Sequence, residues 1–145
     1  PCTMYSQART RAKTPRDLEQ ADAFVRKALE LVEAWGCMWF MENPYTGLLK
    51  TRSVVSGLPY HIVDYCQWRD SRWQPRYRKP TAIWTNSGWR PERPRCSRRT
   101  CPCVEDGRHA ERIRFEEFHA LETYAIPPLL CESVREHCAV AVAVA

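Results

Sequence analysis

The spacing of apolar residues in the first third of the chain predicts an amphipathic helix. Apolar side chains recur at every third or fourth position, which places them in one stripe along a helix. The stripe consists of Leu18, Ala21, Val25, Ala28 and Val32. Thr14 and Pro15 precede it with the residue types favoured at the N-cap and at the first helical position. Because Gly36 has the residue type that commonly ends a helix, we expect a helix that begins at Pro15 and ends before Gly36.

A run of apolar residues at positions 37–41 follows this glycine at once. Five apolar residues in a row are typical of a strand buried on both faces, as in a parallel sheet. The run stops at Glu42, Asn43 and Pro44. Open α/β sheets place their ligand crevices at the carboxyl ends of strands, so we expect Glu42 to be a functional carboxylate.

The rest of the chain predicts two more strands and a final helix. Residues 61–66 partly alternate between apolar and polar, and residues 81–85 form a short apolar segment bounded by turn residues. Pro127 and Pro128 open a last helix. Residues 139–145 alternate strictly between alanine and valine, a low-complexity tail to which the sequence assigns no function.

Composition indicates a globular domain. The 145 residues are 44% hydrophobic and 27% charged, with a net charge of +5, which fits one domain with its own core. We find neither an apolar run of about 18 residues, which a membrane span would need, nor a signal-peptide pattern. The chain begins at Pro1 without methionine, as a processed or partial chain does. Most of the eight cysteines are scattered, which favours a reducing, intracellular compartment.

Basic residues and tryptophans are concentrated between positions 67 and 95. This stretch has eight lysines and arginines against two acids, and four of the six tryptophans. Arginines interleaved with aromatic side chains suit phosphate contacts and base stacking. They suit a protein interface equally well, and a solvated loop whose tryptophans cover a sheet edge is the third interpretation. The candidate residues are Trp68, Arg69, Trp73, Arg76, Arg78 and Lys79.

A cluster of metal-ligand residue types follows this stretch. Cys96, Cys101, Cys103 and His109 lie within 14 positions of one another, and three thiols with one imidazole can close a tetrahedral zinc site. The single residue between the second and third cysteines is a tighter gap than the usual two. Cys66 could replace Cys103 as the fourth ligand if the end of its strand comes near. A loop with free thiols and a disulfide are the alternatives to a structural zinc.

Several short motifs resemble the later motifs of cytosine-C5 DNA methyltransferases and occur in the same order. They are Pro1-Cys2-Thr3, Glu42-Asn43-Pro44 and the closing residues 126–130. The longer sequence segments that contain or follow these motifs resemble the viral and protist branch of that family. They are residues 1–6, 42–52, 64–66 and 83–86. The resemblance covers most of residues 1–138 but only the second half of the family's catalytic domain.

This resemblance implies an α/β fold and a particular chemistry. The fold would be a partial Rossmann-like methyltransferase sheet of mostly parallel strands with flanking helices and a Cys-rich loop. Residues 1–138 would form the domain, with residues 67–112 as an excursion from it. Cys2 would be the nucleophile that adds to cytosine C6, and Glu42 would protonate N3 once the base is flipped out of the duplex. Asn43 would shape the loop that holds Glu42.

The sequence departs from the family's pattern in several places. The glycine-rich loop that binds S-adenosylmethionine belongs to the family's first half, and no G-x-G pattern occurs here. The family places two arginines just before the strand at residues 81–85, where they help to hold the flipped cytosine. Pro80 and Ala82 occupy those positions. The stretch from Asn86 to Ile126 has no room for the family's DNA-recognition domain.

Two functions are therefore open. The first is a methyltransferase-derived domain that is inactive by itself and acts as an accessory or structural subunit of a larger assembly, with the Trp- and Arg-rich stretch docking protein partners. The second is part of an active DNA cytosine-C5 methyltransferase. In that case DNA would be a partner, and S-adenosylmethionine would bind only if the missing half exists.

Overall fold

Two compact units make up the chain. The computed structural model describes residues 2–7, 12–75, 77–99, 101–109 and 125–144. Unit 1 consists of Pro1–His61 and Thr81–Gly88. Unit 2 consists of Ile62–Pro80 and Trp89–Ala145. Each unit is described by itself below.

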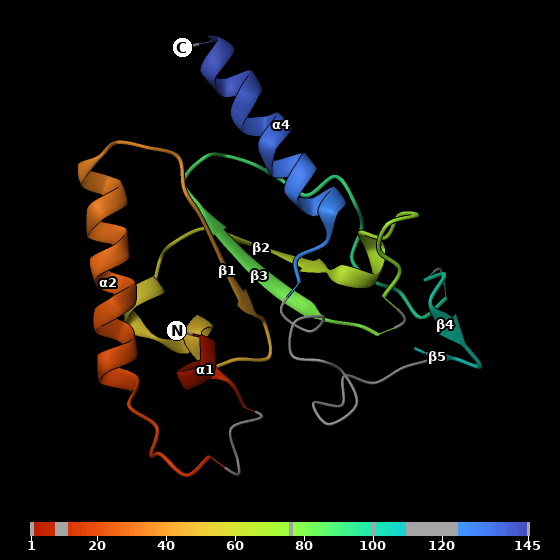
Figure 1. Ribbon diagram of the computed structural model, residues 1–145, viewed down its shortest axis with the longest axis horizontal. Helices are drawn as coiled ribbons and strands as arrows, with labels where there is room; N and C mark the ends of the chain where they lie inside the picture. The colour runs from red at the N-terminus through yellow and green to blue at the C-terminus, as the bar shows by residue number, and fades with distance from the viewer. Residues whose placement is uncertain (1, 8–11, 76, 100, 110–124, 145) are drawn as a thin grey trace. The chain divides into compact units, whose positions relative to one another are not determined.

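The described elements include both helices and strands, so the fold is mixed α/β, as the sequence predicts (Figure 1). The helices are α1 (Cys2–Tyr5), α2 (Leu18–Ala34) and α4 (Pro128–Val144). The strands are β1 (Phe40–Pro44), β2 (Tyr60–Asp64), β3 (Pro80–Thr85), β4 (Val104–Glu105) and β5 (Arg108–His109). Three 3-10 turns complete the described elements: η2 (Leu49–Thr51), η3 (Ser53–Val55) and η4 (Tyr65–Gln67).

Helix α2 begins three residues later than the sequence suggests. Its N-cap is Asp17, whose side chain accepts a hydrogen bond from the backbone N–H of Gln20. The prediction of Thr14 as N-cap is therefore wrong, because the Asp17 carboxylate fills that role closer to the apolar stripe. The predicted end is confirmed: Gly36 follows the helix with a φ of +60°, a conformation that glycine adopts at little cost.

The core of unit 1 forms between α2, β3 and the short turns. Each of its seven buried residues is at most 4% exposed. They are Tyr5, Ala21, Val25, Leu49, Val55, Ala82 and Trp84. Burying a large apolar side chain contributes roughly 1.5–3 kcal/mol, so this cluster holds α1 and α2 against the sheet.

Strands β1 and β3 pair in antiparallel orientation, with Glu42 opposite Ile83 and Asn43 opposite Ala82. The described sheet has the order β1-β3-β2. The expectation of parallel strands is wrong for the β1–β3 pair. The apolar run at residues 37–41 suggested a strand buried on both faces. The first residues of β1 are only half-buried, so such a strand does not form. The Rossmann-like character of the whole sheet stays a prediction.

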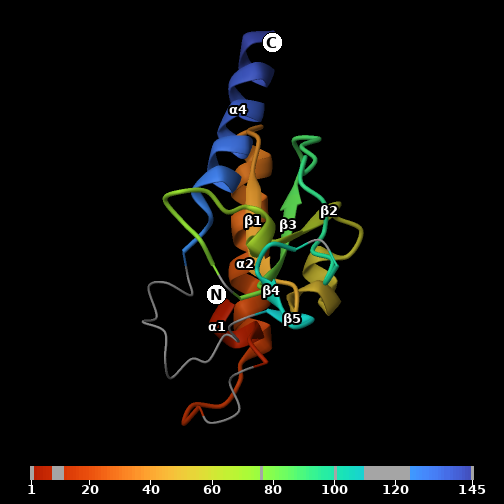
Figure 2. The ribbon, with the colours of Figure 1, turned by 90° about the vertical axis from the view of Figure 1, so that its right-hand side faces the viewer.

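Unit 2 contains a small hairpin and the last helix. Strands β4 and β5 pair in antiparallel orientation (Figure 2). Helix α4 begins at Pro128, as predicted, and Leu130 on it is 2% exposed. The alternating tail continues this helix as far as Val144, in keeping with the strong helix propensity of alanine. Within the described residues, none of the helices has the length and apolar character to cross a membrane.

Candidate functional site

The segment that opens with Cys2 lies beside the loop that follows β1. The backbone N–H of Leu48 in this loop donates a hydrogen bond of 2.9 Å to the carbonyl oxygen of Tyr5, the last residue of α1. Two motifs that are 40 residues apart in the sequence are thereby joined within unit 1. The side chain of Cys2 lies outside the described part of the structure.

Glu42 and Asn43 occupy opposite faces of β1. Trp39 and Met41 pack against the unit 1 core, and side chains alternate along a strand, so Asn43 faces the core and Glu42 faces away from it. Asn43 is 4% exposed, and within the described part of the chain its Oδ1 has no hydrogen-bond partner. A buried polar atom without a partner costs about 1–3 kcal/mol, so a donor at this atom would stabilise the loop.

Gly47 packs against both motifs, and a side chain there would disturb them. A Cβ on Gly47 would lie 3.0 Å from the Pro44 carbonyl oxygen, 3.1 Å from Asn43 Oδ1 and 3.3 Å from the Tyr5 carbonyl oxygen. Backbone atoms cannot yield as a flexible side chain can, so Gly47→Ala is expected to destabilise the protein by about 1–3 kcal/mol. Denaturant unfolding measures the loss. Thr46→Ala, at the exposed neighbouring position, should change it little, and equal effects would contradict the prediction.

A buried carboxylate ties α1 to α2. The Tyr5 hydroxyl donates a hydrogen bond of 2.8 Å to Asp22 Oδ1. Arg52 donates through Nε at 2.9 Å and Nη2 at 2.7 Å to Asp22 Oδ2. The hydrogen bonds from Arg52 lower the pKa of Asp22 despite its burial, while burial and the bond to Asp22 raise the pKa of Tyr5. The sequence pattern did not predict this network, although Asp22 stands directly beside Ala21 of the apolar stripe.

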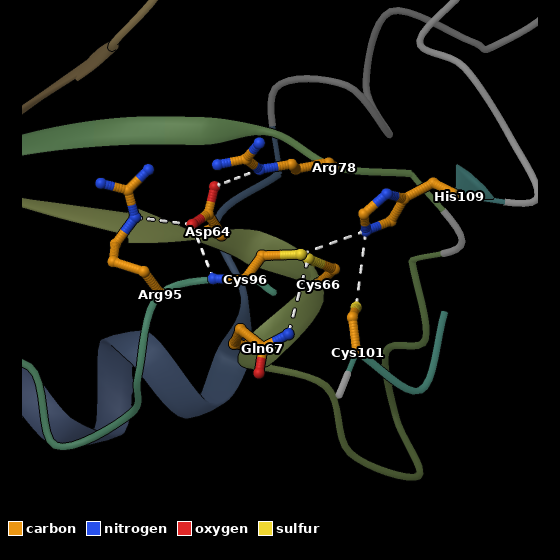
Figure 3. Close-up of polar contacts among 8 residues, drawn as sticks. All are labelled: Asp64, Cys66, Gln67, Arg78, Arg95, Cys96, Cys101 and His109. Atoms are coloured by element: carbon orange, nitrogen blue, oxygen red, sulfur yellow. Dashed lines mark hydrogen bonds and ion pairs between the residues drawn. The ribbon is translucent and has the colours of Figure 1, made fainter. Parts of the chain in front are cut away.

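Three cysteines and one histidine converge in unit 2. The ligand atoms of Cys66, Cys96, Cys101 and His109 all lie within 4.8 Å of one another (Figure 3). The sulfur atoms of Cys96 and Cys101 are each 3.4 Å from His109 Nε2. Three residues of the predicted cluster are thus brought together, and Cys66 is the fourth. This group could bind a metal ion such as zinc.

Cys103 is buried beside the group but its sulfur points elsewhere. Its thiol donates to the Pro75 carbonyl oxygen at 3.1 Å, and Arg69 Nη1 donates to its sulfur at 3.4 Å. Of the two candidates for the fourth position, Cys66 is therefore the one whose sulfur joins the other ligand atoms. The seven cysteines that the structure describes are all free thiols.

Burial sets the protonation of this group. Burial, together with the neighbouring Cys96 and Cys101, raises the pKa of the Cys66 thiol. Burial and the positive charge of Arg78 lower the pKa of His109. The imidazole is therefore held neutral, which is the form that ligates metals.

Asp64 anchors the chain next to the cysteines. Its carboxylate is fully buried and accepts hydrogen bonds from Arg78 Nε at 2.8 Å, Arg95 Nε at 2.6 Å and the Cys96 backbone N–H at 2.9 Å (Figure 3). Burial alone would raise the pKa of Asp64, but these hydrogen bonds outweigh it and lower the pKa. An ionised aspartate thus joins the end of β2 to the loop that carries Cys96.

Part of the Trp- and Arg-rich stretch lies in the interior of unit 2. Trp68 is 1% exposed, so it is not available as the surface anchor that the sequence suggests. Trp73 packs edge-on against Tyr65, with ring centroids 6.0 Å apart, and Lys79 Nζ lies 4.6 Å from the centroid of the same ring. Arg76 lies outside the described residues. A docking or nucleic-acid role for this stretch stays a prediction.

Comparison with known proteins shows similarity to a viral protein. The chain is 31% identical over 138 residues to a "Probable DNA (cytosine-5)-methyltransferase" of Frog virus 3 (isolate Goorha). The chain is therefore related to a cytosine-C5 methyltransferase. The match covers 86% of this chain and 59% of the viral protein, so the chain spans about three fifths of its relative. No protein-family model and no solved structure matches the chain.

Proposed function

We propose that this chain forms the catalytic part of a DNA cytosine-C5 methyltransferase. The relationship to the viral protein supports the reaction class. The observation that carries the proposal is the hydrogen bond from Leu48 N–H to the Tyr5 carbonyl oxygen. It joins the segment that opens with Cys2 to the loop that follows β1, and this supports the proposal because two groups that react with one base must lie near each other.

In this proposal the two side chains activate cytosine together. C5 of cytosine is too weakly nucleophilic to be methylated unaided. The Cys2 thiolate adds to C6 and forms an S–C6 bond, while Glu42 donates its proton to N3 and balances the electron pair that moves there. The adduct is an enamine with electron density at C5. The base must leave the duplex for this addition, because C6 is otherwise covered by stacking.

Asn43 supports Glu42 from the opposite face of β1. Its amide is buried and its Oδ1 lacks a partner within the described residues. A hydrogen-bond donor from the substrate or from the segment around Cys2 would satisfy this oxygen and order the loop that follows β1.

The residues of this chain do not fit S-adenosylmethionine. The five glycines are at positions 36, 47, 57, 88 and 107. Their spacing is too wide for a glycine-rich loop, in which closely spaced glycines let the backbone approach a nucleotide. We therefore assign this chain the activation of the base and assign it no step in delivering the methyl group.

A second candidate is an accessory subunit without catalysis. It is favoured by β3, where Pro80 and Ala82 occupy the positions at which the related family has arginines. Ala82 is fully buried in the unit 1 core, so this position cannot supply a cation to a flipped base. An accessory subunit would keep the fold and lose the addition step.

Two base analogues separate these candidates. DNA with 2-pyrimidinone in place of cytosine forms a lasting adduct by thiol addition alone, because this base lacks the 4-amino group and is more electrophilic at C6. We expect a denaturant-stable complex of this DNA with the chain. Cys2→Ser should abolish the complex, and Cys37→Ser, at an exposed position, should leave it intact.

The second analogue reports on methyl transfer. DNA with 5-fluorocytosine is trapped only after the methyl group has been delivered, because fluorine cannot leave C5 as a proton does. With S-adenosylmethionine present, we expect trapping only when a cofactor-binding segment is also present. Failure of the 2-pyrimidinone complex would overturn the catalytic proposal and favour the accessory subunit.

A further inference from the structure

We propose that Cys66, Cys96, Cys101 and His109 bind one structural Zn²⁺ ion within unit 2. This proposal does not depend on the proposed reaction at Cys2 and Glu42, and the four ligand atoms come from three segments of the chain. Cys66 lies in the turn η4 directly after β2, Cys96 and Cys101 lie in the loop before β4, and His109 ends β5.

The distances match a tetrahedron around zinc. Zn–S bonds of about 2.3 Å and a Zn–N bond of about 2.05 Å at tetrahedral angles give an S···N edge of about 3.6 Å and an S···S edge of about 3.8 Å. In the structure both S···N distances, from Cys96 and from Cys101 to His109 Nε2, are 3.4 Å. All ligand atoms lie within 4.8 Å of one another. The two S···N edges are thus close to the required length, and the other ligand atoms lie near enough to join them around one ion.

Hydrogen bonds alone explain this arrangement poorly. A neutral imidazole nitrogen has either one proton or one lone pair. It can therefore form one well-directed hydrogen bond, yet His109 Nε2 is equidistant from two sulfur atoms. A cation between three sulfur atoms and one nitrogen accounts for the equal distances directly.

The surroundings of the group offer little other stabilisation. The buried cluster here consists of Cys66, Cys101 and Cys103, with Cys96 and Val104 packed against it. One aliphatic side chain and small thiols bury little apolar area, and the strands β4 and β5 have two residues each. A hairpin this short, packed on so few apolar side chains, commonly takes its folding energy from a bound metal.

Neighbouring residues hold the ligands in place. Asp64, two residues before Cys66, accepts the Cys96 backbone N–H at 2.9 Å and so fixes two ligand-bearing segments together. Gln67 Nε2 donates towards Cys66 Sγ at 3.9 Å. N–H groups directed at sulfur and carboxylates behind the ligands are typical of the outer shell of metal sites. Asp64 is therefore a positioning residue for the metal and not a ligand.

Metal analysis of the purified 145-residue chain tests the proposal. We expect about one equivalent of zinc per chain, retained on gel filtration and removed by a strong chelator together with loss of the local fold around β4 and β5. Replacement by Co²⁺ should give the intense sulfur-to-metal charge-transfer absorption of a site with three thiolates. Less than half an equivalent of zinc, or a cobalt spectrum without thiolate bands, would overturn the proposal.

Matched variants identify the fourth ligand. Cys66→Ser should lower the affinity for Co²⁺ at least tenfold and weaken the charge-transfer band. Cys103→Ser, at another buried cysteine of the same cluster, should leave both unchanged. The reverse pattern would overturn the assignment of Cys66. Where a variant fails to fold, the Co²⁺ spectrum of the wild-type chain still decides whether three thiolates bind the metal.

Asp64→Asn separates positioning from ligation. It removes the charge that binds Arg78 and Arg95 but leaves every ligand atom. We expect weaker binding of Co²⁺, by about ten- to a hundredfold, with an unchanged charge-transfer spectrum. An altered spectrum would show that Asp64 is a ligand, and an unchanged affinity would overturn its positioning role.

Discussion

Glu42→Gln is expected to slow the formation of the covalent complex with 2-pyrimidinone DNA by about 10²- to 10⁴-fold, the contribution typical of a general acid. Glutamine can still hydrogen-bond the ring at N3 but has no proton to give, so the thiolate adduct would form as an unneutralised anion. Glu42 lies on the face of β1 turned away from the unit 1 core, and the substitution keeps its size and hydrogen-bonding capacity. The measurement is the rate at which the denaturant-stable complex appears.

Glu33→Gln is the matched control for this experiment. Glu33 is exposed near the end of α2, so its neutralisation changes the net charge by the same amount without touching β1. A change in DNA binding that comes from net charge alone would affect both variants equally. Equal rates for Glu42→Gln and the wild-type chain would remove Glu42 from the chemistry while leaving the role of Cys2 to be judged on Cys2→Ser.

Local features of the fold were readable from the sequence because short-range interactions determine them. Gly36 ends α2 since its left-handed conformation is accessible to glycine at little cost. Pro128 begins α4 since a proline at the first helical position loses no hydrogen bond. The N-cap was misplaced because Thr14 and Asp17 both have residue types that cap helices well. The choice between them depends on which one directly precedes the apolar residues that pack against the core.

Features that depend on long-range pairing were harder to predict. The apolar run before Glu42 has the composition of a doubly buried strand, yet Trp39 and Met41 pack on one side only. The partner of β1 is β3, which lies about 40 residues further along the chain and runs in the opposite direction. Hydrophobic pattern alone carries no information about that partner.

The metal ligands show the same difference between short-range features, which the sequence predicts, and long-range ones, which it does not. Cys96, Cys101 and His109 are close in sequence, so their spacing pointed to a site. Cys66 is 30 residues earlier and joins them because β2 ends beside the cysteine loop, an arrangement that the buried Asp64 stabilises. The sequence left Cys66 and Cys103 as alternatives because spacing cannot say towards which side a sulfur points.

Acidification is expected to loosen the segment that opens with Cys2, through Asp22. The hydrogen bonds from Arg52 hold the pKa of Asp22 below its ordinary value of 3.8 in the folded chain. A carboxyl group with a lowered pKa stabilises the fold fully above its unfolded pKa, and this contribution disappears as the pH falls through the folded pKa. The free energy of unfolding of unit 1 should therefore be constant near neutral pH and fall in acid below about pH 4.

Asp22→Asn should remove this pH dependence and reproduce the acid-weakened state at neutral pH. The amide leaves the buried Tyr5 hydroxyl and Arg52 without a charged acceptor, which costs about 1–3 kcal/mol. Denaturant unfolding followed by tryptophan fluorescence at several pH values measures both effects. The difference between wild type and variant should shrink as the pH falls, because the wild-type carboxylate becomes protonated.

Glu30→Gln provides the matched control, since Glu30 forms an ion pair of 3.3 Å with Lys27 on the exposed face of the same helix. Solvent screens such a pair, so its loss should change the free energy of unfolding by no more than about 0.5 kcal/mol. The Asp22 network also joins α1 to α2, so Asp22→Asn should slow the covalent reaction of Cys2 while Glu30→Gln leaves it unchanged. Identical behaviour of the two variants would mean that Asp22 neither stabilises unit 1 nor positions the thiol.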